Sequence, residues 1–345
     1  ISPHDSLGTH INVQTAHQEV KRVVPREHPA TNECWISDRD RFAFEGAGSE
    51  DRLLQPLVRA AEGLKEISWE EAIRLAADAV EFARQDASET LAALMHPLAS
   101  TEEGFLLQKI MRAVGSSNID HRLSQRDFAD DQLAAPYPSL ETPLVDLSSL
   151  DGLLLVGANP RKEIPLLALR IRELVGAGGR VGTLGSSGID ANFDVAVESV
   201  VDPASIVDAL CQLISSFEGG AEKLPNGFTP QPEGVLSPAE VTEMSDLLKG
   251  SASIILGEQA LNHPSGAAIR VLASVLARVS GGAIGVIAPA NSAGAWWAGV
   301  VPHRLPGGIE ASTAGANAQT ILDLEAKTVL LYGLEPSIDH CDPRK

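Results

Sequence analysis

The chain has 345 residues, a hydrophobic content of 44% and a formal net charge of −19. This length predicts a large core and two or three domains or subdomains. The negative charge comes with no basic run, which argues against nucleic acid as a partner. The longest apolar region, 271–290, is interrupted by Arg278, Ser280 and paired glycines, so we expect no direct membrane insertion.

The three cysteines, Cys34, Cys211 and Cys341, are too few and too scattered for a disulfide framework. A chain of this kind is expected in a reducing compartment, with the cytosol as the default. The sequence opens without an initiator Met or a signal-peptide pattern and stops just after the strand-like segment 328–333. We therefore expect a piece of a longer polypeptide, truncated at the C-terminus.

Residues 1–60 are predicted to form a small β-rich domain. This stretch is rich in His, Arg and Asp, and its apolar residues do not follow a helical period. Residues 11–24 fit a β-hairpin or small meander. The segment 35–44, WISDRDRFAF, mixes aromatic and charged side chains and is expected to be an irregular layer that packs on the next domain.

Residues 61–345 alternate between predicted strands and helices. Three Ser-x-x-Glu sequences, at 68–71, 100–103 and 237–240, have the spacing of a capping box at a helix start. The predicted strands are 90–95, 153–156, 181–184, 253–257, 283–287 and 327–332, and the predicted helices begin near residues 68, 100, 163, 203, 237 and 264. The alternation predicts an α/β fold with doubly wound, mostly parallel sheets.

The segment 151–188 contains one complete strand, helix, strand unit. Its first strand is a continuous apolar run closed by Gly157, which is typical of a strand buried on both faces. A parallel pair needs a crossover of about a dozen residues or more, so helix 163–175 is predicted to be that crossover. Ligands in such sheets bind beyond the carboxyl ends of strands, which makes Gly157, Asn159 and Pro160 a candidate cofactor-binding turn.

The alternative for this turn is a tight strand-to-helix connection that holds no ligand. No G-x-G-x-x-G follows a strand and no G-x-x-x-x-G-K-S/T occurs, so the phosphate-cradling fingerprints are missing. In this interpretation the Asn159 side chain bonds local backbone and Pro160 fixes the entry to the helix.

Two polar constellations also have a structural alternative. Residues of metal-ligand type cluster near the start, but their spacing matches no closed zinc pattern, so the alternative is an exposed polar loop. Ser186 and Ser187 lie between glycines as in a nucleophile turn, yet the second glycine of G-x-S-x-G is missing and no triad can be argued. The metal-ligand types are His4, Asp5, His10, His17 and Cys34.

Residues 290–308 are predicted to form a long loop that carries Trp296 and Trp297. The two indoles either line a pocket or anchor a loop or an interface. Two neighbouring indoles cannot both point inward from an ordinary turn without special packing, so we expect at least one to be partly exposed.

Three strings resemble a known family across almost the whole chain: NECWISDRDRFAFEGAGSEDRLLQPLVR at 32–59, GANPRKEIPLL at 157–167 and ANSAGAWWAGVVPH at 290–303. They look like the G subunits of bacterial NADH:quinone oxidoreductase, respiratory complex I. The resemblance is to the molybdopterin-oxidoreductase-like region of that family. It implies iron-sulfur clusters in an N-terminal part outside this chain. It also implies other peripheral-arm subunits as partners, and a peripheral place on the cytoplasmic side of the bacterial inner membrane.

The first departure from the family concerns an additional 4Fe-4S cluster that related members carry on C-x-x-C-x-x-x-C plus a distant Cys. The matching positions here are Ser2, Asp5, Thr9 and Cys34. Such clusters are normally held by four thiolates, so Cys34 is interpreted as the remnant of a lost site. We expect no cofactor in this fragment.

The second departure concerns molybdenum. In cofactor-using relatives the run after residues 101–121 leads into a cysteine that ligates the metal, whereas here it is RLSQRDFADD. Ser124 or Asp127 could replace it, but nothing in the sequence selects either. The resemblance therefore implies that the turn at Gly157, Asn159 and Pro160 is a vestigial, empty molybdopterin-type turn. The fragment is expected to be structural, to bind partner subunits and not to be catalytic alone; the alternative is a molybdopterin-dependent oxidoreductase domain with its own active site.

Overall fold

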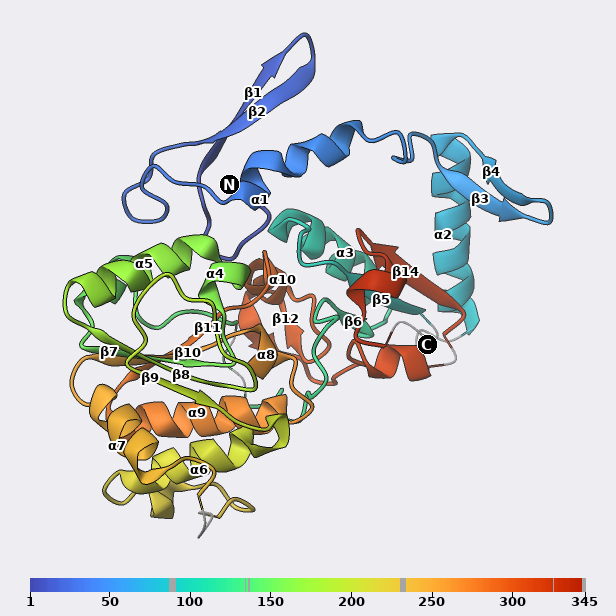
Figure 1. Cartoon of the computed structure of the whole chain (residues 1–345). Coiled ribbons are helices and arrows are strands. Elements are labelled where there is room, and N and C mark those ends of the chain that lie inside the picture. Colours follow the sequence, from blue (N-terminus) through green and yellow to red (C-terminus); the bar gives the residue numbers. More distant parts are fainter. Residues whose placement is uncertain (87–90, 134, 136, 230–233, 325, 343–345) are drawn as a thin grey trace. The chain divides into compact units, whose positions relative to one another are not determined.

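The computed structural model describes residues 1–86, 91–133, 135, 137–229, 234–324 and 326–342. They form two compact units, and the chain passes between them more than once (Figure 1). Unit 1 comprises 1–11, 25–37 and 124–293, and unit 2 comprises 12–24, 38–123 and 294–345. The predicted division into 1–60 and 61–345 stays a prediction, and its boundary falls between the paired strands β3 (Leu57–Ala60) and β4 (Gly63–Glu66).

Unit 1 is built on a five-stranded parallel sheet with the strand order β11-β10-β7-β8-β9. Its strands are β7 (Gly152–Val156), β8 (Arg180–Gly185), β9 (Val197–Val200), β10 (Ala252–Leu256) and β11 (Ala283–Val286). The first strand, β7, is central, and the chain builds outward from it in both directions. The order therefore reverses between β7 and β10, which is the topological switch point of the sheet.

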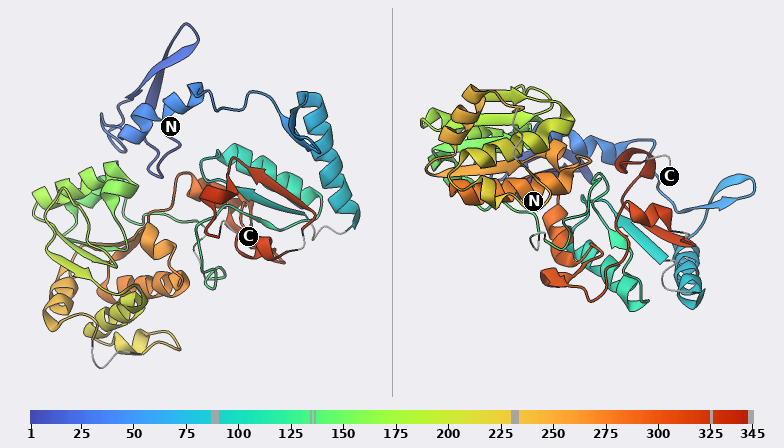
Figure 2. Two further views of the ribbon diagram at one scale, coloured as in Figure 1. Left: turned by 45° about the vertical axis from the view of Figure 1, so that its right-hand side comes forward. Right: turned by 90° about the horizontal axis from the view of Figure 1, so that it is seen from below.

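Helices cover both faces of this sheet, as the two views of Figure 2 also show. On one face lies α5 (Pro165–Gly176), the predicted crossover between β7 and β8, which follows the short helix α4 (Pro160–Glu163). On the other face lie α6 (Ile206–Ser216), α7 (Pro238–Leu247) and α9 (Gly266–Ser280), the last preceded by α8 (Glu258–Leu261). The predicted doubly wound α/β fold is confirmed.

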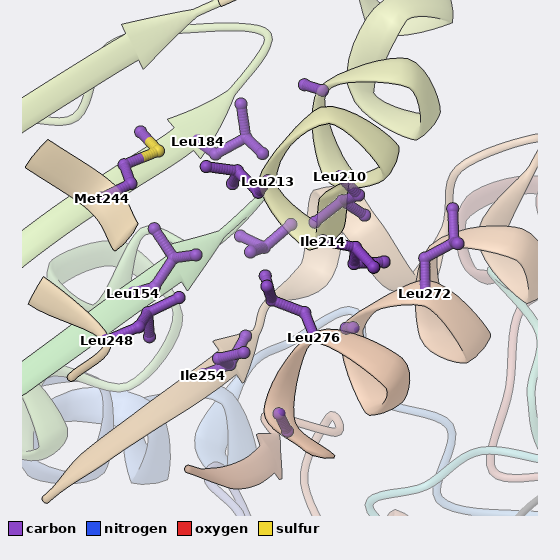
Figure 3. Packing of buried hydrophobic residues seen from close by; sticks show 14 of the residues in the cluster. Leu154, Leu184, Leu210, Leu213, Ile214, Met244, Leu248, Ile254, Leu272 and Leu276 are labelled. Carbon is purple, nitrogen blue, oxygen red and sulfur yellow. The ribbon is translucent and has the colours of Figure 1, made fainter. Parts of the chain in front are cut away.

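Successive residues of β7 supply two separate cores. Leu153 and Leu155 belong to the cluster under α5, whereas Leu154 and Val156 belong to the larger cluster under α6, α7 and α9. Figure 3 shows the second cluster, with Leu154 facing side chains of α6 and α9. Burying one such side chain fully contributes roughly 1.5–3 kcal/mol, so the apolar run that predicted this strand also stabilises both faces of the sheet.

Unit 2 contains a three-stranded parallel sheet with the order β14-β5-β6. The strands are β5 (Leu91–Met95), β6 (Ile119–Asp120) and β14 (Thr328–Tyr332). The helices of this unit include α2 (Trp69–Asp86), α3 (Thr101–Ala113) and the short α11 (Pro336–Asp339). The capping boxes predicted at Ser100 and Ser237 are both formed, at the starts of α3 and α7. At Ser68 the hydroxyl accepts the Glu71 amide at 3.2 Å.

The predicted hairpin near the start is present as β1 (Ile11–Ala16) and β2 (Glu19–Pro25). The segment expected to be irregular instead contains the short helix α1 (Asp38–Phe42) and a 3-10 turn, 43–48. Two hairpins were not predicted: β3 (Leu57–Ala60) with β4 (Gly63–Glu66), and β12 (Arg304–Leu305) with β13 (Ile309–Glu310). The expected loop 290–308 contains the helix α10 (Ser292–Ala298).

Candidate functional site

The turn after β7 has the backbone geometry of a tight connection. Gly157 has φ +54°, which a residue without Cβ adopts at little cost, and Pro160 is the first residue of α4. The Asn159 carbonyl accepts the amides of Lys162 and Glu163 at 3.0 and 2.9 Å. The prediction that the Asn159 side chain bonds local backbone is wrong: its Oδ1 is buried and has no hydrogen-bond partner among the described residues. The Asn159 carbonyl starts the helix, and the side chain makes no capping bond.

Glycines end the three strands nearest the switch point, and the chain's own atoms fill the space beside each of them. A Cβ on Gly157 would lie 2.6 Å from the Ala260 nitrogen of α8. A Cβ on Gly257 would lie 2.3 Å from the Ala158 Cα, and one on Gly185 would lie 3.0 Å from the Gln259 Oε1. Glycine at 157 and 257 therefore allows α8 and the turns after β7 and β10 to pack closely.

A carboxylate joins the two turns at the switch point. Glu163, the last residue of α4, accepts the Asn159 amide on Oε1 at 2.6 Å and the Glu258 amide on Oε2 at 2.9 Å. Burial raises the pKa of the Glu163 carboxyl, while the two amide bonds act in the opposite direction. Sequence reasoning did not single out Glu163, because its partner at residue 258 is distant in the chain.

Ser186, considered above as a possible nucleophile, is part of the same packing. Its amide donates to Gln259 Oε1 at 2.9 Å, and the Gln259 amide nitrogen donates to Ser186 Oγ at 2.5 Å. This pair ties the turn after β8 to α8. Its partner in this pair is an amide and not a general base.

Three of the four positions aligned with the 4Fe-4S ligands lie together and bond to one another. Ser2, Asp5 and Thr9 are buried, and the Thr9 hydroxyl donates to Asp5 Oδ2 at 3.0 Å. Asp5 Oδ1 accepts the Leu7 amide at 3.0 Å, and the Ser2 amide donates to the Thr9 carbonyl at 2.7 Å. Cys34 is an exposed free thiol. The donor set therefore does not fit a thiolate-bound cluster, because hydroxyls and a carboxylate stand where sulfur is required.

The alternative metal site near the start is not formed by the described residues, which contain no group of three or more His, Cys, Asp or Glu side chains placed to hold an ion. His10 instead stacks on His28, with ring centroids 4.1 Å apart. Burial is the main cause that lowers the pKa of His10. Asp5 is engaged as described above.

The segment that replaces the molybdenum-ligating run is held against α9. Asp127 Oδ2 accepts the Ala267 amide at 2.9 Å, so one of the two candidate ligands is used to bond the first turn of a helix. Arg270 of α9 donates to both carboxylate oxygens of Asp130, at 2.7 and 2.5 Å. The other candidate, Ser124, is exposed. The residues present therefore do not form a site that fits molybdenum. The Asp130–Arg270 pair joins two distant parts of the chain and could not be predicted from spacing.

A buried polar cluster that sequence reasoning missed lies at the end of β6 in unit 2. Asp120 accepts two bonds from the Arg122 guanidinium, both at 2.9 Å, and the Ala318 amide at 3.0 Å. The Arg122 guanidinium lies 5.0 Å from the ring centre of Trp296. His121 Nδ1 is 2.7 Å from the Val300 carbonyl, and burial lowers the pKa of His121 to about 4.

The two adjacent tryptophans of α10 differ in environment. Trp296 is 7% exposed and makes an edge contact with His303, whereas Trp297 is 50% exposed. The prediction that at least one indole is partly exposed is confirmed. A short helix achieves this because successive side chains point about 100° apart.

Comparison with known proteins shows to which protein family the chain belongs. The family model for molybdopterin oxidoreductase matches residues 52–324, so the chain belongs to the molybdopterin oxidoreductase family. A second family model, NADH-ubiquinone oxidoreductase NDSU1/NuoG-like, 4Fe-4S domain, matches residues 1–45. The match at 1–45 covers the substituted ligand positions.

Two curated relatives of this chain are the same kind of subunit of one enzyme. The chain is 34% identical over 178 residues to the G subunit of the NADH-quinone oxidoreductase of Rickettsia bellii, and 33% identical over 171 residues to that of Rickettsia conorii. These matches cover 52% and 50% of this chain and 25% of each relative, so the matched region spans a quarter of the relatives' length. The resemblance to the G subunits that the sequence predicts is confirmed.

A solved structure supports the fold alone. Acetylene hydratase from Pelobacter acetylenicus matches with a TM-score of 0.56 at 16% identity, over 79% of this chain and 41% of that one.

Proposed function

We propose that this chain is the structural and partner-binding region of the G subunit of a bacterial NADH:quinone oxidoreductase, respiratory complex I. The full-length subunit would pass electrons from NADH-reduced flavin toward quinone through iron-sulfur clusters outside this region. The NuoG-like match at 1–45 and the curated relatives support the subunit assignment.

The observation that carries the proposed absence of a redox centre is the hydrogen-bonded group at Ser2, Asp5 and Thr9. Each of these side chains is buried, and Asp5 accepts bonds from the Thr9 hydroxyl and the Leu7 amide. One thiol, Cys34, remains of the four that a 4Fe-4S cluster normally uses. Hydrogen bonds therefore engage the groups that stand where thiolates would be needed, which supports the proposal.

The proposed partners are other peripheral-arm subunits, and the proposed location is the cytoplasmic side of the bacterial inner membrane. No helix within the described ranges combines the length and the apolar character that crossing a bilayer requires. Attachment to the membrane would then come through partner subunits. The half-exposed Trp297 is the first candidate for a contact with one of them.

The second candidate function is a molybdopterin-dependent oxidoreductase domain with its own active site. The family match over 52–324 favours it. Against it stand the packed switch-point edge and the use of Asp127 to bond the start of α9.

Metal analysis of the full-length subunit, comparing the natural chain with Cys34→Ser, separates these possibilities. We expect equal iron content in both and no stoichiometric molybdenum, because this thiol binds no cluster and the region binds no molybdopterin. A chain with Ser2→Cys, Asp5→Cys and Thr9→Cys together serves as the positive control, since it restores four thiols at the aligned positions. Loss of iron in Cys34→Ser would reject the proposed absence of a cluster, and stoichiometric molybdenum would favour the second function.

A further inference from the structure

The bonds of Glu163 have more than a local role. Its bond to the Asn159 amide lies within one turn of chain, but its bond to the Glu258 amide connects residues far apart in sequence. The two amides belong to the turns after β7 and β10, the two strands that flank the switch point. One carboxylate therefore ties together the two strand ends between which a ligand would enter such a sheet.

The surroundings are shaped to accept this carboxylate. A Cβ on Gly257 would lie 2.8 Å from Glu163 Oε2, so a larger residue there would displace the carboxylate. Burial disfavours the charged form and raises the pKa of Glu163, whereas both amide bonds favour it. Glu163 is partly buried, and a charge that loses part of its hydration is retained at low cost where donors compensate it, as the two amides do here.

Gln259 makes a second connection at the same edge. It bonds both the amide and the hydroxyl of Ser186, which joins α8 to the turn after β8. Its Oε1 lies 3.0 Å from the position of a Cβ on Gly185. Glu163 and Gln259 together connect the ends of three adjacent strands.

We propose that Glu163 is an internal anion, supplied by the chain itself, that bonds both turns at the switch-point edge and holds it closed, with Gln259 as the second tie, so that this edge takes no phosphate-bearing cofactor. The inference rests on the proposed function only in that both exclude a bound molybdopterin. Beyond the proposed function, it names Glu163 as the residue that closes the edge and the two amide bonds by which it does so.

The test uses the full-length subunit and compares Glu163→Ala with Glu258→Ala. The second variant is the matched control, because it removes an exposed carboxylate from the adjacent turn and changes the net charge equally. We expect Glu163→Ala to lower the melting temperature by roughly 4 °C or more relative to Glu258→Ala. Acetate should restore most of that difference, while sodium chloride at the same ionic strength should not. Inorganic pyrophosphate should leave the melting temperature of the natural chain unchanged.

Equal melting temperatures for the two variants, no acetate-specific recovery, or a saturable pyrophosphate effect on the natural chain would each overturn the proposal. If Glu163→Ala does not fold, Glu163→Gln gives the deciding measurement by hydrogen exchange. Glutamine has one acceptor oxygen in place of two, so the amide of Asn159 or of Glu258 should exchange about five- to tenfold faster, the factor set by one lost hydrogen bond. Unchanged exchange at both amides would overturn the proposal as well.

These outcomes are separate from a failure of the proposed function. Iron content and co-purification with peripheral-arm subunits test the subunit role and do not depend on acetate. Normal assembly together with unchanged amide exchange in Glu163→Gln would reject the internal anion alone. Acetate rescue in a subunit that does not assemble would reject the subunit role alone.

Discussion

At the scale of single residues, Asn159 occupies a helix-capping position without making a capping hydrogen bond. The residue occupies the N-terminal boundary of α4, where a polar side chain usually bonds a free amide, yet its Oδ1 is buried without a partner in the described structure. Removing a buried acceptor that makes no bond costs little and can stabilise. We expect Asn159→Ala to change the free energy of unfolding by less than about 0.5 kcal/mol. Chemical denaturation checks this, and a loss near 1 kcal/mol or more would show that the side chain bonds in solution.

His121 predicts a pH dependence of stability. Its pKa is lowered from 6.5 to about 4, mainly by burial, with Asp120 acting in the opposite direction. The unfolded chain therefore takes up this proton at a higher pH than the folded chain, so acidification from pH 7 toward pH 4 favours unfolding. The expected loss between pH 7 and pH 5 is about 2 kcal/mol from this residue.

Denaturant titrations at several pH values measure this loss in the natural chain and in His121→Asn, whose amide nitrogen can donate to the Val300 carbonyl in place of Nδ1. In His121→Asn, the part of the loss in unfolding free energy that comes from His121 should be absent. His17→Asn in the exposed turn of the β1–β2 hairpin is the control, and its pH profile should match the natural chain. Parallel profiles for His121→Asn and the natural chain would contradict the prediction.

At the scale of elements, the segment 124–133 is held against α9 by the Asp130–Arg270 ion pair and by the bonds of Asp127 to Ala267 and Arg270. The side chains of Arg270 and Asp130 are 17% and 8% exposed, so removing one partner leaves a poorly solvated charge on the other. Breaking such a pair costs about 3 kcal/mol. We expect Arg270→Gln to destabilise unit 1 by that amount and to expose the segment to limited proteolysis. Arg161→Gln is the matched control, since its pair with Asp190 is largely exposed and should contribute less than about 1 kcal/mol.

The sequence predicts elements better than it predicts sites. Apolar runs such as Leu153–Val156 and the Ser-x-x-Glu spacing at 237–240 act locally, and both gave the correct elements. The strand β9 and the β3–β4 hairpin were not predicted, because each strand is short and has no continuous apolar run; β9 is half exposed and β4 is exposed throughout. The contacts of Glu163, Asp130 and Asp120 join residues that are distant in the chain, so no local pattern indicates them.

At the scale of the whole molecule, Trp297 is the proposed contact with partner subunits. Half of this indole is exposed, whereas its neighbour Trp296 is buried beside Arg122 and His303. Trp297→Ala in the full-length subunit should keep the fold and weaken co-purification with the other peripheral-arm subunits. Trp296→Ala is the contrasting control, and it should destabilise the subunit itself by about 3 kcal/mol or more. Unchanged assembly of Trp297→Ala would place the interface elsewhere.

The pairing of β5 with β14 has a consequence for synthesis on the ribosome. Leu91 pairs with Thr328, and the entire five-stranded sheet of unit 1 is encoded between them. At typical elongation rates, β5 leaves the ribosome on the order of 10 seconds before β14 is available. During that interval one edge of β5 has no partner strand, although the strands of unit 1 can already assemble. We therefore expect unit 1 to become protease-resistant first in arrested nascent chains, and chaperones that bind exposed strands to associate with unit 2 until Tyr332 has emerged.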